Sequence, residues 1–207
     1  MPRWEHGSEE RLKQAAMELF EEQGFEDTSA VQIAKRARVT TRTFFRYFPD
    51  KEEVLFADSE LLRESLALGI REAPDVVEPL RAVTRTLSGF DWERLGPRES
   101  QRRRDGVITS NPELLERDLI KQQRTADEFS AVLRDRGVDP DTAELAARVG
   151  IAVFRTAYRQ WLEADDDADL AKLTEAALSL LATIVPADAP TARGKAPRTR
   201  SRVRGTS

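Results

Sequence analysis

The sequence predicts an all-α protein in which a small N-terminal domain of three helices is joined to a larger helical domain. No stretch alternates convincingly between apolar and polar residues, as a half-buried strand would, so no sheet is expected. Apolar residues instead recur every three or four positions, as on one face of an α-helix. Helix starts are marked at Pro112 and Pro140, each preceded by an N-cap residue, and Gly137 marks a helix end.

The first helix is expected over residues 8–23. Ser8 is suited to cap it, and Glu9 and Glu10 favour its positive N-terminal end. Gly24 supplies the left-handed residue that commonly follows a helix. The apolar stripe consists of Leu12, Ala15, Ala16, Leu19 and Phe20. This stripe gives the next two helices a surface to pack on.

Two shorter helices follow, separated by a tight turn. The first begins after Thr28 and Ser29, either of which can cap it. Its apolar face consists of Ala30, Ile33, Ala34 and Ala37. The second is capped by Thr40 and must end before Pro49, because the residue before a proline is pushed out of the α region. Two short helices joined in this way form a helix-turn-helix.

The second short helix has an apolar side and a charged side. At 100° per residue Phe44 and Phe48 lie together, whereas Arg42 and Arg46 point almost directly away from them. We therefore expect the phenylalanines in the core and the arginines outside, flanked by Thr43 and Phe45. Such a face fits the major groove of DNA, where arginine binds guanine O6 and N7. At the edges of this face lie side chains whose hydroxyl or ammonium groups can bind DNA phosphates, namely Thr40, Thr41, Tyr47 and Lys51.

The charge distribution supports a DNA contact at this place. The chain has a net charge of −4, yet residues 28–51 carry +5 and residues 187–207 carry another +5. The positive field is therefore confined to two segments of an otherwise acidic chain, as expected for one DNA-facing end. A solvated arginine face is the alternative for an isolated helix of this kind.

The remaining helices form a second domain. A longer helix is expected over residues 50–70, capped by Asp50 and shared between the two cores, so that it can transmit a displacement. Further helices are expected at 76–90, 97–109, 112–136, 140–164 and 168–185. Residues 187–207 have little to bury and are expected to be a disordered basic tail. The domains are thus predicted at residues 8–56 and 57–186.

The last two helices carry apolar stripes that suit a two-fold interface. Two such helices from each subunit would build a four-helix bundle. The residues assigned to this interface are Leu145, Val149, Ala152, Val153, Leu173, Ala177, Leu180 and Leu181. The alternative is that they pack inside one subunit. Two DNA half-sites one helical turn apart also require two subunits, which favours a homodimer.

Composition excludes several other kinds of site. The 207 residues include no cysteine and one histidine, so the usual zinc sites and cysteine nucleophiles are excluded, and no metal or cofactor is expected. With no apolar run of membrane-spanning length and no signal-peptide pattern, we expect a soluble, cytoplasmic protein without a membrane partner. No carboxylate pair stands out for acid–base chemistry, so no catalytic residue is assigned.

Three sequence motifs with characteristic spacing lie between Ala16 and Leu55. They read A-x-x-L-F-x-x-x-G-F-x-x-T-S, I-A-x-x-A-x-V-T and T-F-F-R-Y-F-P-x-K-E-x-V-L. This order resembles the DNA-binding domain of the tetracycline-repressor (TetR) family. The resemblance implies an all-helical homodimer that releases its operator when a small ligand enters the C-terminal domain. It assigns to the DNA face Ser29, Thr40, Thr41, Arg42, Thr43, Phe45, Tyr47 and Lys51.

Two residues depart from the pattern of this family. Arg38 stands at the turn position where the family usually has glycine, so it must adopt the left-handed conformation at some cost or shift the turn. Phe45 replaces the usual tyrosine and has no hydroxyl for a phosphate. The neighbouring Arg46 is placed to compensate.

The effector site is expected among large side chains of the middle helices. The candidates are Trp92, Ile108, Phe129, Phe154, Tyr158 and Trp161, with the alternative that they are simply core. Arg103 and Arg104 belong to an arginine run that is either a solvated face or an anion site for a phosphate-bearing effector. Residues 102–117, with Trp161 and Leu162, resemble regulators associated with acyl-coenzyme A-like ligands.

The sequence therefore predicts a ligand-responsive transcriptional regulator, namely a repressor that a small, largely apolar effector releases from a palindromic operator. Its expected partners are double-stranded operator DNA, a small-molecule effector and a second copy of the chain. Two alternatives come from other classes: an all-α enzyme with a carboxylate-based site, and an architectural DNA-binding protein without a ligand.

Overall fold

Nine α-helices and two short 3₁₀ helices make up the part of the chain that the computed structural model describes, residues 4–165 and 167–184. No strand occurs within these residues, in agreement with the predicted all-α class. The α-helices are α1 (Trp4–Gln23), α2 (Ala30–Arg36), α3 (Thr41–Tyr47), α4 (Ser59–Glu72), α5 (Pro79–Gly89), α6 (Arg98–Ser110), α7 (Pro112–Asp135), α8 (Pro140–Glu163) and α9 (Leu170–Ile184). The 3₁₀ helices are η1 (Glu53–Phe56) and η2 (Trp92–Leu95).

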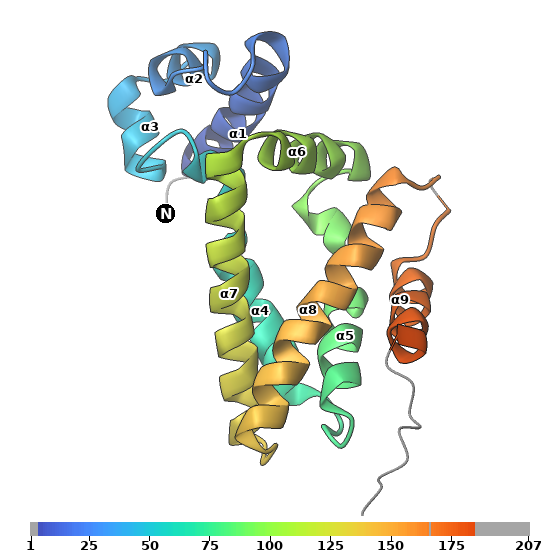
Figure 1. The fold of residues 1–207 in the computed structure, drawn as a ribbon. Helices are drawn as coiled ribbons and strands as arrows, with labels where there is room; N and C mark the ends of the chain where they lie inside the picture. Colours follow the sequence, from blue (N-terminus) through green and yellow to red (C-terminus); the bar gives the residue numbers. More distant parts are fainter. Residues whose placement is uncertain (1–3, 166, 185–207) are drawn as a thin grey trace, which may run out of the picture.

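The elements form two groups, each with its own apolar core. Figure 1 shows α1, α2 and α3 together at one end of the molecule and α4, α5, α7 and α8 as a bundle below them, with α6 lying across between the two. In the first core Leu12, Ile33 and Phe44 are fully buried. The second core is built around α8, which packs against α5, α7 and α9.

The first core extends beyond the helices of the N-terminal group. Ile108 of α6 and Leu114 of α7 are buried in it. The corner between α6 and α7 is therefore part of the wall on which the helix-turn-helix rests. The side chain of Ile108, one of the predicted effector residues, is 2% exposed and packs with the N-terminal group, which fits the alternative that it is simply core.

The helix predicted over residues 50–70 is interrupted. Asp50 accepts a hydrogen bond from the backbone N–H of Glu53 at 2.7 Å, but this segment forms only the 3₁₀ turn η1, and α4 begins at Ser59. The consecutive residues Val54, Leu55 and Phe56 are all buried. Three consecutive residues span about 200° of an α-helix, so a straight helix cannot turn all three into one core. The two groups are thus not joined by the single rigid helix that was predicted.

The other helix ends lie close to their predicted positions. α1 begins at Trp4, so Ser8 lies inside the helix and is not its N-cap. α5 begins at Pro79 rather than at residue 76, and α6 to α9 agree with the prediction to within two residues. The predicted tail, residues 187–207, lies outside the described residues. Among the described helices, none combines the length and the hydrophobicity that spanning a membrane requires.

Candidate nucleic-acid interface and ligand site

Hydroxyl groups cap both helices of the helix-turn-helix. Ser29 accepts a hydrogen bond from the backbone N–H of Gln32, whose side chain in turn accepts one from the backbone N–H of Ser29. Thr40 accepts a hydrogen bond from the backbone N–H of Thr43 at 3.1 Å. Thr28, the other candidate cap of α2, is buried and donates to the carbonyl of Gly24 at 2.8 Å. Ser29 and Thr40 therefore fix where α2 and α3 begin.

The helix α3 has the two faces that its sequence predicts. Phe44 and Phe48 are 0% and 3% exposed and anchor the helix in the first core. Arg42 and Arg46 are exposed on the other side. Phe45 is also exposed, although its ring meets that of Phe44 edge-on with centroids 5.3 Å apart. The fold thus presents two guanidinium groups and one phenyl ring on the outward side of a short, anchored helix.

Arg46 and Tyr47 form a pair at the end of α3. The Nη2 of Arg46 donates to the hydroxyl of Tyr47 at 3.2 Å, and its guanidinium lies over the Tyr47 ring at 5.0 Å from the centroid. Stacking of this kind holds a guanidinium in place without neutralising its charge. The pair can therefore offer a positive charge and a hydroxyl together.

The turn between α2 and α3 is left-handed at Arg38, with φ of 57°. The turn is closed by a hydrogen bond from the backbone N–H of Val39 to the carbonyl of Ala34 at 2.9 Å. Of the two options that the sequence leaves open, Arg38 thus adopts the glycine-like conformation instead of shifting the turn. The side chain is exposed next to α3.

Two of the basic residues counted at this end are bound by their own chain. Arg36 pairs with Glu18 at 3.2 Å and with Glu22 at 2.6 Å, and the hydrogen bond from Arg36 lowers the pKa of the Glu22 carboxyl. Lys51 donates through Nζ to the carbonyls of Phe25 at 2.8 Å and Glu26 at 3.3 Å. Lys51 therefore stabilises the loop after α1, and its ammonium does not lie free at the rim of the α3 face as predicted.

The segment that follows α3 is held by α7. Arg117 contacts both carboxylate oxygens of Asp50 at 3.0 Å and reaches Glu53 at 3.3 Å, and Lys121 binds Glu53 at 2.8 Å. These pairs, which link residues more than 60 positions apart, were not predicted from the sequence. They attach the segment that follows α3 to helix α7 of the bundle.

An aromatic cluster lies between η2 and α8. Trp92 stacks on Phe154 at 5.0 Å and contacts Tyr158 at 5.1 Å, and Tyr158 in turn contacts Trp161 at 5.6 Å. Burial raises the pKa of Tyr158 to about 12, so its hydroxyl stays protonated and acts as a donor. This cluster gathers four of the predicted effector residues at one place.

Gln101 of α6 links the members of this cluster through hydrogen bonds, a role that was not predicted from the sequence. Its carbonyl oxygen accepts a hydrogen bond from the Tyr158 hydroxyl at 2.5 Å, and its amide donates to the backbone carbonyls of Trp92 and Gly96, each at 2.7 Å. Gln101 is 5% exposed. The available signal was its position seven residues before Ile108, which places both on one side of the helix.

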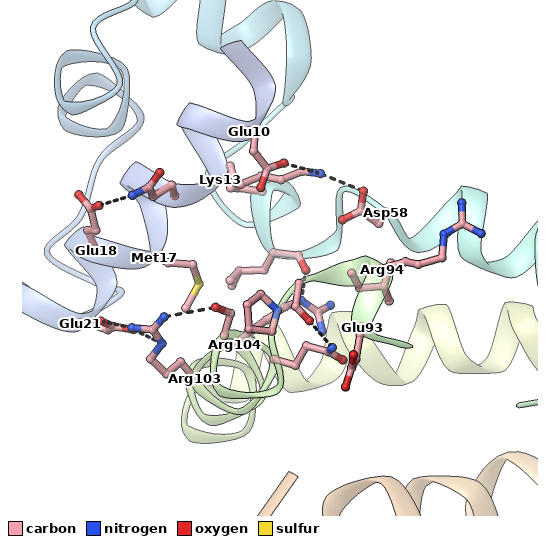
Figure 2. A pocket seen from close by; sticks show the side chains of 18 residues that line it. Glu10, Lys13, Met17, Glu18, Glu21, Asp58, Glu93, Arg94, Arg103 and Arg104 are labelled. Atoms are coloured by element: carbon pink, nitrogen blue, oxygen red, sulfur yellow. Dashed lines mark hydrogen bonds and ion pairs between the residues drawn. The ribbon is translucent and has the colours of Figure 1, made fainter. Parts of the chain in front are cut away.

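A pocket of about 710 Å³ lies between α1 and α6, with the segments around Leu55 and Leu95 completing its walls. Figure 2 shows its charged side chains: Lys13 reaches toward Asp58 on one side, and Arg103 pairs with Glu21 on the other, at 3.2 Å. Arg104 lies between them and donates from Nε to the carbonyl of Leu55 at 2.5 Å.

The predicted effector residues do not line a common surface of this pocket. Arg103 and Arg104 line it, whereas the four aromatic residues of the cluster do not. Phe129 is 0% exposed in the second core, which fits the alternative that it is simply core. Gln101 connects the two places, because it lines the pocket and also binds Tyr158.

The outer faces of α8 and α9 carry exposed apolar side chains. Leu145 and Leu180 are 64% and 57% exposed, and Ala152 is also exposed. The partly buried members of the predicted set are Val149, Leu173, Ala177 and Leu181. Val153 is 7% exposed, so it packs inside the subunit and is not on the outer face as predicted.

Comparison with known proteins places these features in a family. A model described as "Bacterial regulatory proteins, tetR family" matches residues 12–57, and one described as "MftR C-terminal domain" matches residues 77–186. The chain is 31% identical over 194 residues to the HTH-type transcriptional regulator TcmR of Streptomyces glaucescens, which covers 83% of this chain and 81% of that protein.

Two further proteins are similar over most of the chain. The putative mycofactocin biosynthesis transcriptional regulator MftR of Mycobacterium tuberculosis is 27% identical over 176 residues, covering 82% of this chain and 87% of that protein. The crystal structure of NalD, the secondary repressor of a multidrug efflux pump in Pseudomonas aeruginosa, has a TM-score of 0.55 at 22% identity, covering 86% of this chain and 96% of that one. The matched models and the TcmR relationship show that the chain belongs to the TetR family of bacterial DNA-binding transcriptional regulators.

Proposed function

We propose that this regulator is a ligand-responsive repressor that acts in the cytoplasm and binds a palindromic operator as a homodimer. The observation that carries the proposal is the orientation of α3, with Phe44 and Phe48 buried and Arg42 and Arg46 exposed. A helix anchored in this way can enter a major groove and present donors to base edges. Residues 8–56 would read the DNA, and residues 57–186 would bind the effector and the second subunit.

The residues of the DNA face divide into base readers and phosphate contacts. Arg42 projects from the first turn of α3, and we assign it to a guanine. The Arg46–Tyr47 pair offers a charge and a hydroxyl, which suits a phosphate and replaces the hydroxyl that Phe45 lacks. Apart from Lys51, the rest of the predicted set lies around the two helix starts and consists of Ser29, Thr40, Thr41 and Thr43.

The outer face of α8 and α9 is proposed as the dimer interface. Exposed leucines on both helices, among them Leu145 and Leu180, would be covered by the same helices of a second subunit. An isologous contact whose two-fold axis runs along the length of the subunit would put two copies of α3 on one side of the dimer. The two copies would read symmetric half-sites.

The effector is proposed to be a largely apolar molecule with an anionic group, of the acyl-coenzyme A type. The anionic group of the effector would bind in the pocket at Arg103 and Arg104. Its apolar part would insert among the aromatic side chains of the cluster, which Gln101 connects to the pocket. Such a ligand would displace the hydrogen bond between Tyr158 and Gln101 and move α6. Because Arg104 of α6 is bound to the carbonyl of Leu55, that movement would reach the helix-turn-helix.

The experiment starts from duplexes selected for binding out of a random pool. A preformed complex of the protein with the selected operator is titrated with lauroyl-coenzyme A, and release is followed by fluorescence anisotropy. The proposal predicts release together with a thermal stabilisation of several degrees. Both effects should be lost when Arg103 and Arg104 are changed to Ala, and both should persist in the control Arg71→Ala, at the end of α4.

The outcomes separate the classes of function. Operator binding without release by a series of acyl chain lengths would contradict this effector class. An architectural DNA-binding protein would select no defined operator and would release no DNA. Failure to select any sequence would contradict the repressor assignment itself.

A further inference from the structure

Phe45 presents a large apolar ring to solvent on the face of α3 that is assigned to DNA. Its side chain is 53% exposed, and of the large apolar residues in the described range 7–57 only Val31 is comparably exposed, at 59%. The ring stands nearly perpendicular to that of the buried Phe44, with an interplanar angle of 85°. Phe45 is therefore both exposed and supported from one side, as a contact residue must be to keep its orientation.

Phe45 shares a strip of the helix surface with Arg42. Residues three apart lie about 60° from each other around an α-helix and about 4.5 Å apart along its axis. Thr41, four residues before Phe45, lies further round the helix on the side away from Arg42. Phe45 thus stands between a hydroxyl at the rim of the face and the guanidinium at its centre.

The chemistry of a phenyl ring restricts what Phe45 can contact on DNA. The ring has no donor or acceptor for a phosphate oxygen or for the polar edges of bases. The apolar group that base edges present in the major groove is the C5-methyl of thymine. Deoxyribose carbons on the groove wall are the other apolar surface, and a contact with them would leave the affinity unchanged when thymine is replaced by uracil.

We propose that Phe45 recognises the C5-methyl group of a thymine in each half-site. The inference rests on the proposed placement of α3 in the major groove. An axial offset of about 4.5 Å corresponds to slightly more than one base-pair step of about 3.4 Å. The thymine therefore lies one or two base pairs from the pair that Arg42 contacts.

This contact differs from the arginine contacts in its response to salt. Burying a methyl group against a phenyl ring releases no counterions, so its contribution to affinity does not change with ionic strength. Loss of the contact should lower the affinity by a constant factor at every salt concentration. Loss of an arginine–phosphate contact should instead reduce the slope of affinity against salt.

The test replaces thymines of the selected operator by uracil, one position at a time and in both half-sites. Uracil keeps every Watson–Crick and groove hydrogen bond of thymine and lacks only the methyl group. With the unchanged 207-residue protein, one symmetric position should show a loss of about fourfold in affinity per half-site, as expected for one buried methyl group. The remaining positions should show little change.

Protein variants assign that effect to Phe45. Phe45→Ala should bind the thymine operator at least about tenfold more weakly, with an unchanged salt slope, and should no longer distinguish thymine from uracil. Val31→Ala removes a similarly exposed apolar side chain from α2 and should still distinguish them. Arg42→Ala should lose affinity and also still distinguish them, because it leaves the methyl contact in place.

Two results would overturn the inference while leaving the repressor assignment intact. Uniform tolerance of uracil throughout an operator that is bound tightly would mean that Phe45 touches no thymine methyl. A uracil effect that persists in Phe45→Ala would assign the methyl contact to another residue. The uracil series needs no change in the protein, so it remains decisive even if Phe45→Ala folds poorly.

Discussion

At the scale of single residues, the turn of the helix-turn-helix shows how one side chain can be retained in an unfavourable backbone conformation. Arg38 has φ of 57°, a region that costs most L-residues roughly 1–2 kcal/mol because Cβ approaches a carbonyl oxygen. The conformation is held by the burial of Ala34 and Ala37 on one side and by the cap at Thr40 on the other. The strain is therefore imposed by the packing of α2 and α3 on α1.

Arg38→Gly should raise the free energy of unfolding by roughly 0.5–1 kcal/mol, because glycine has no Cβ to strain in this region. Arg38→Ala is the matched control, since it removes the same charge and side chain but keeps Cβ. Urea denaturation at one pH measures both. A glycine variant no more stable than the alanine variant would show that the turn carries no strain.

Tyr158 provides a second prediction at this scale. Tyr158→Phe removes the donor to the buried carbonyl oxygen of Gln101 and should lower the free energy of unfolding by about 1–3 kcal/mol. Burial raises the pKa of Tyr158 to about 12 in the folded chain, above about 10 in the unfolded chain. The folded state therefore loses stability as the pH rises from about 10 to about 12.

The phenylalanine variant should lack this alkaline loss. Denaturation curves at pH 8 and at steps between pH 10 and 12 measure it, with Tyr47→Phe, the other tyrosine of the chain, as the control. Equal alkaline losses in the wild type and in Tyr158→Phe would contradict the buried hydroxyl. Tyr47→Phe keeps the hydrogen bond between Tyr158 and Gln101, so it should lose stability at alkaline pH as the wild type does.

At the scale of elements, the corner between α6 and α7 belongs structurally to the helix-turn-helix. Leu114 of α7 is 0% exposed in the first core, and Arg117, one turn later, binds Asp50. The ion pair between Arg117 and Asp50 itself adds little stability, since both partners are more than a third exposed. The apolar contact of Leu114 is therefore the stronger link between the corner and the N-terminal group.

Leu114→Ala should lower the stability of the N-terminal group by about 2–5 kcal/mol, as for a buried leucine that leaves a cavity. Amide hydrogen exchange should show faster exchange in α1, α2 and α3 and little change in α9. Leu119→Ala, on the same helix but 55% exposed, should change neither. Unchanged protection of α2 and α3 in Leu114→Ala would separate the corner from the DNA-binding core.

What the sequence could predict at this scale follows from the range of the interactions. The starts of α2, α3, α7 and α8 are set by residues within three positions, so they could be located without a structure. The burial of Ile108 and Leu114 in the first core depends on contacts with residues more than 50 positions earlier in the chain, and no local pattern reveals it. The same is true of the pairing between Asp50 and Arg117.

The interruption near Ala57 of the helix predicted over residues 50–70 could be predicted from the sequence only in part. Its signal was present as three consecutive apolar residues, Val54 to Phe56, which no single helical face can bury. The acidic residues after Asp50 instead favoured a continuous helix start. The helix is interrupted because all three apolar side chains are buried in the first core.

At the scale of the whole molecule, binding of two symmetric half-sites requires a dimer, which we propose is held by α8 and α9. Leu180→Asp would place a charge in the proposed interface and should raise the dissociation constant of the dimer by about a hundredfold or more. Light scattering after size-exclusion chromatography measures the mass directly. Leu119→Asp introduces the same charge on the exposed side of α7 and should leave the dimer intact. A Leu180→Asp variant that remains dimeric would locate the interface elsewhere.

The most direct test of the central claim, that the outward face of α3 reads the operator, is guanine N7 methylation interference on the selected duplex. N7 lies in the major groove, and methylation blocks the approach of a guanidinium. Guanines related by two-fold symmetry should show interference for the wild type, and those guanines should show none for Arg42→Ala. Interference that is identical in the wild type and the variant, or none at any guanine of a tightly bound operator that contains symmetric guanines, would contradict it.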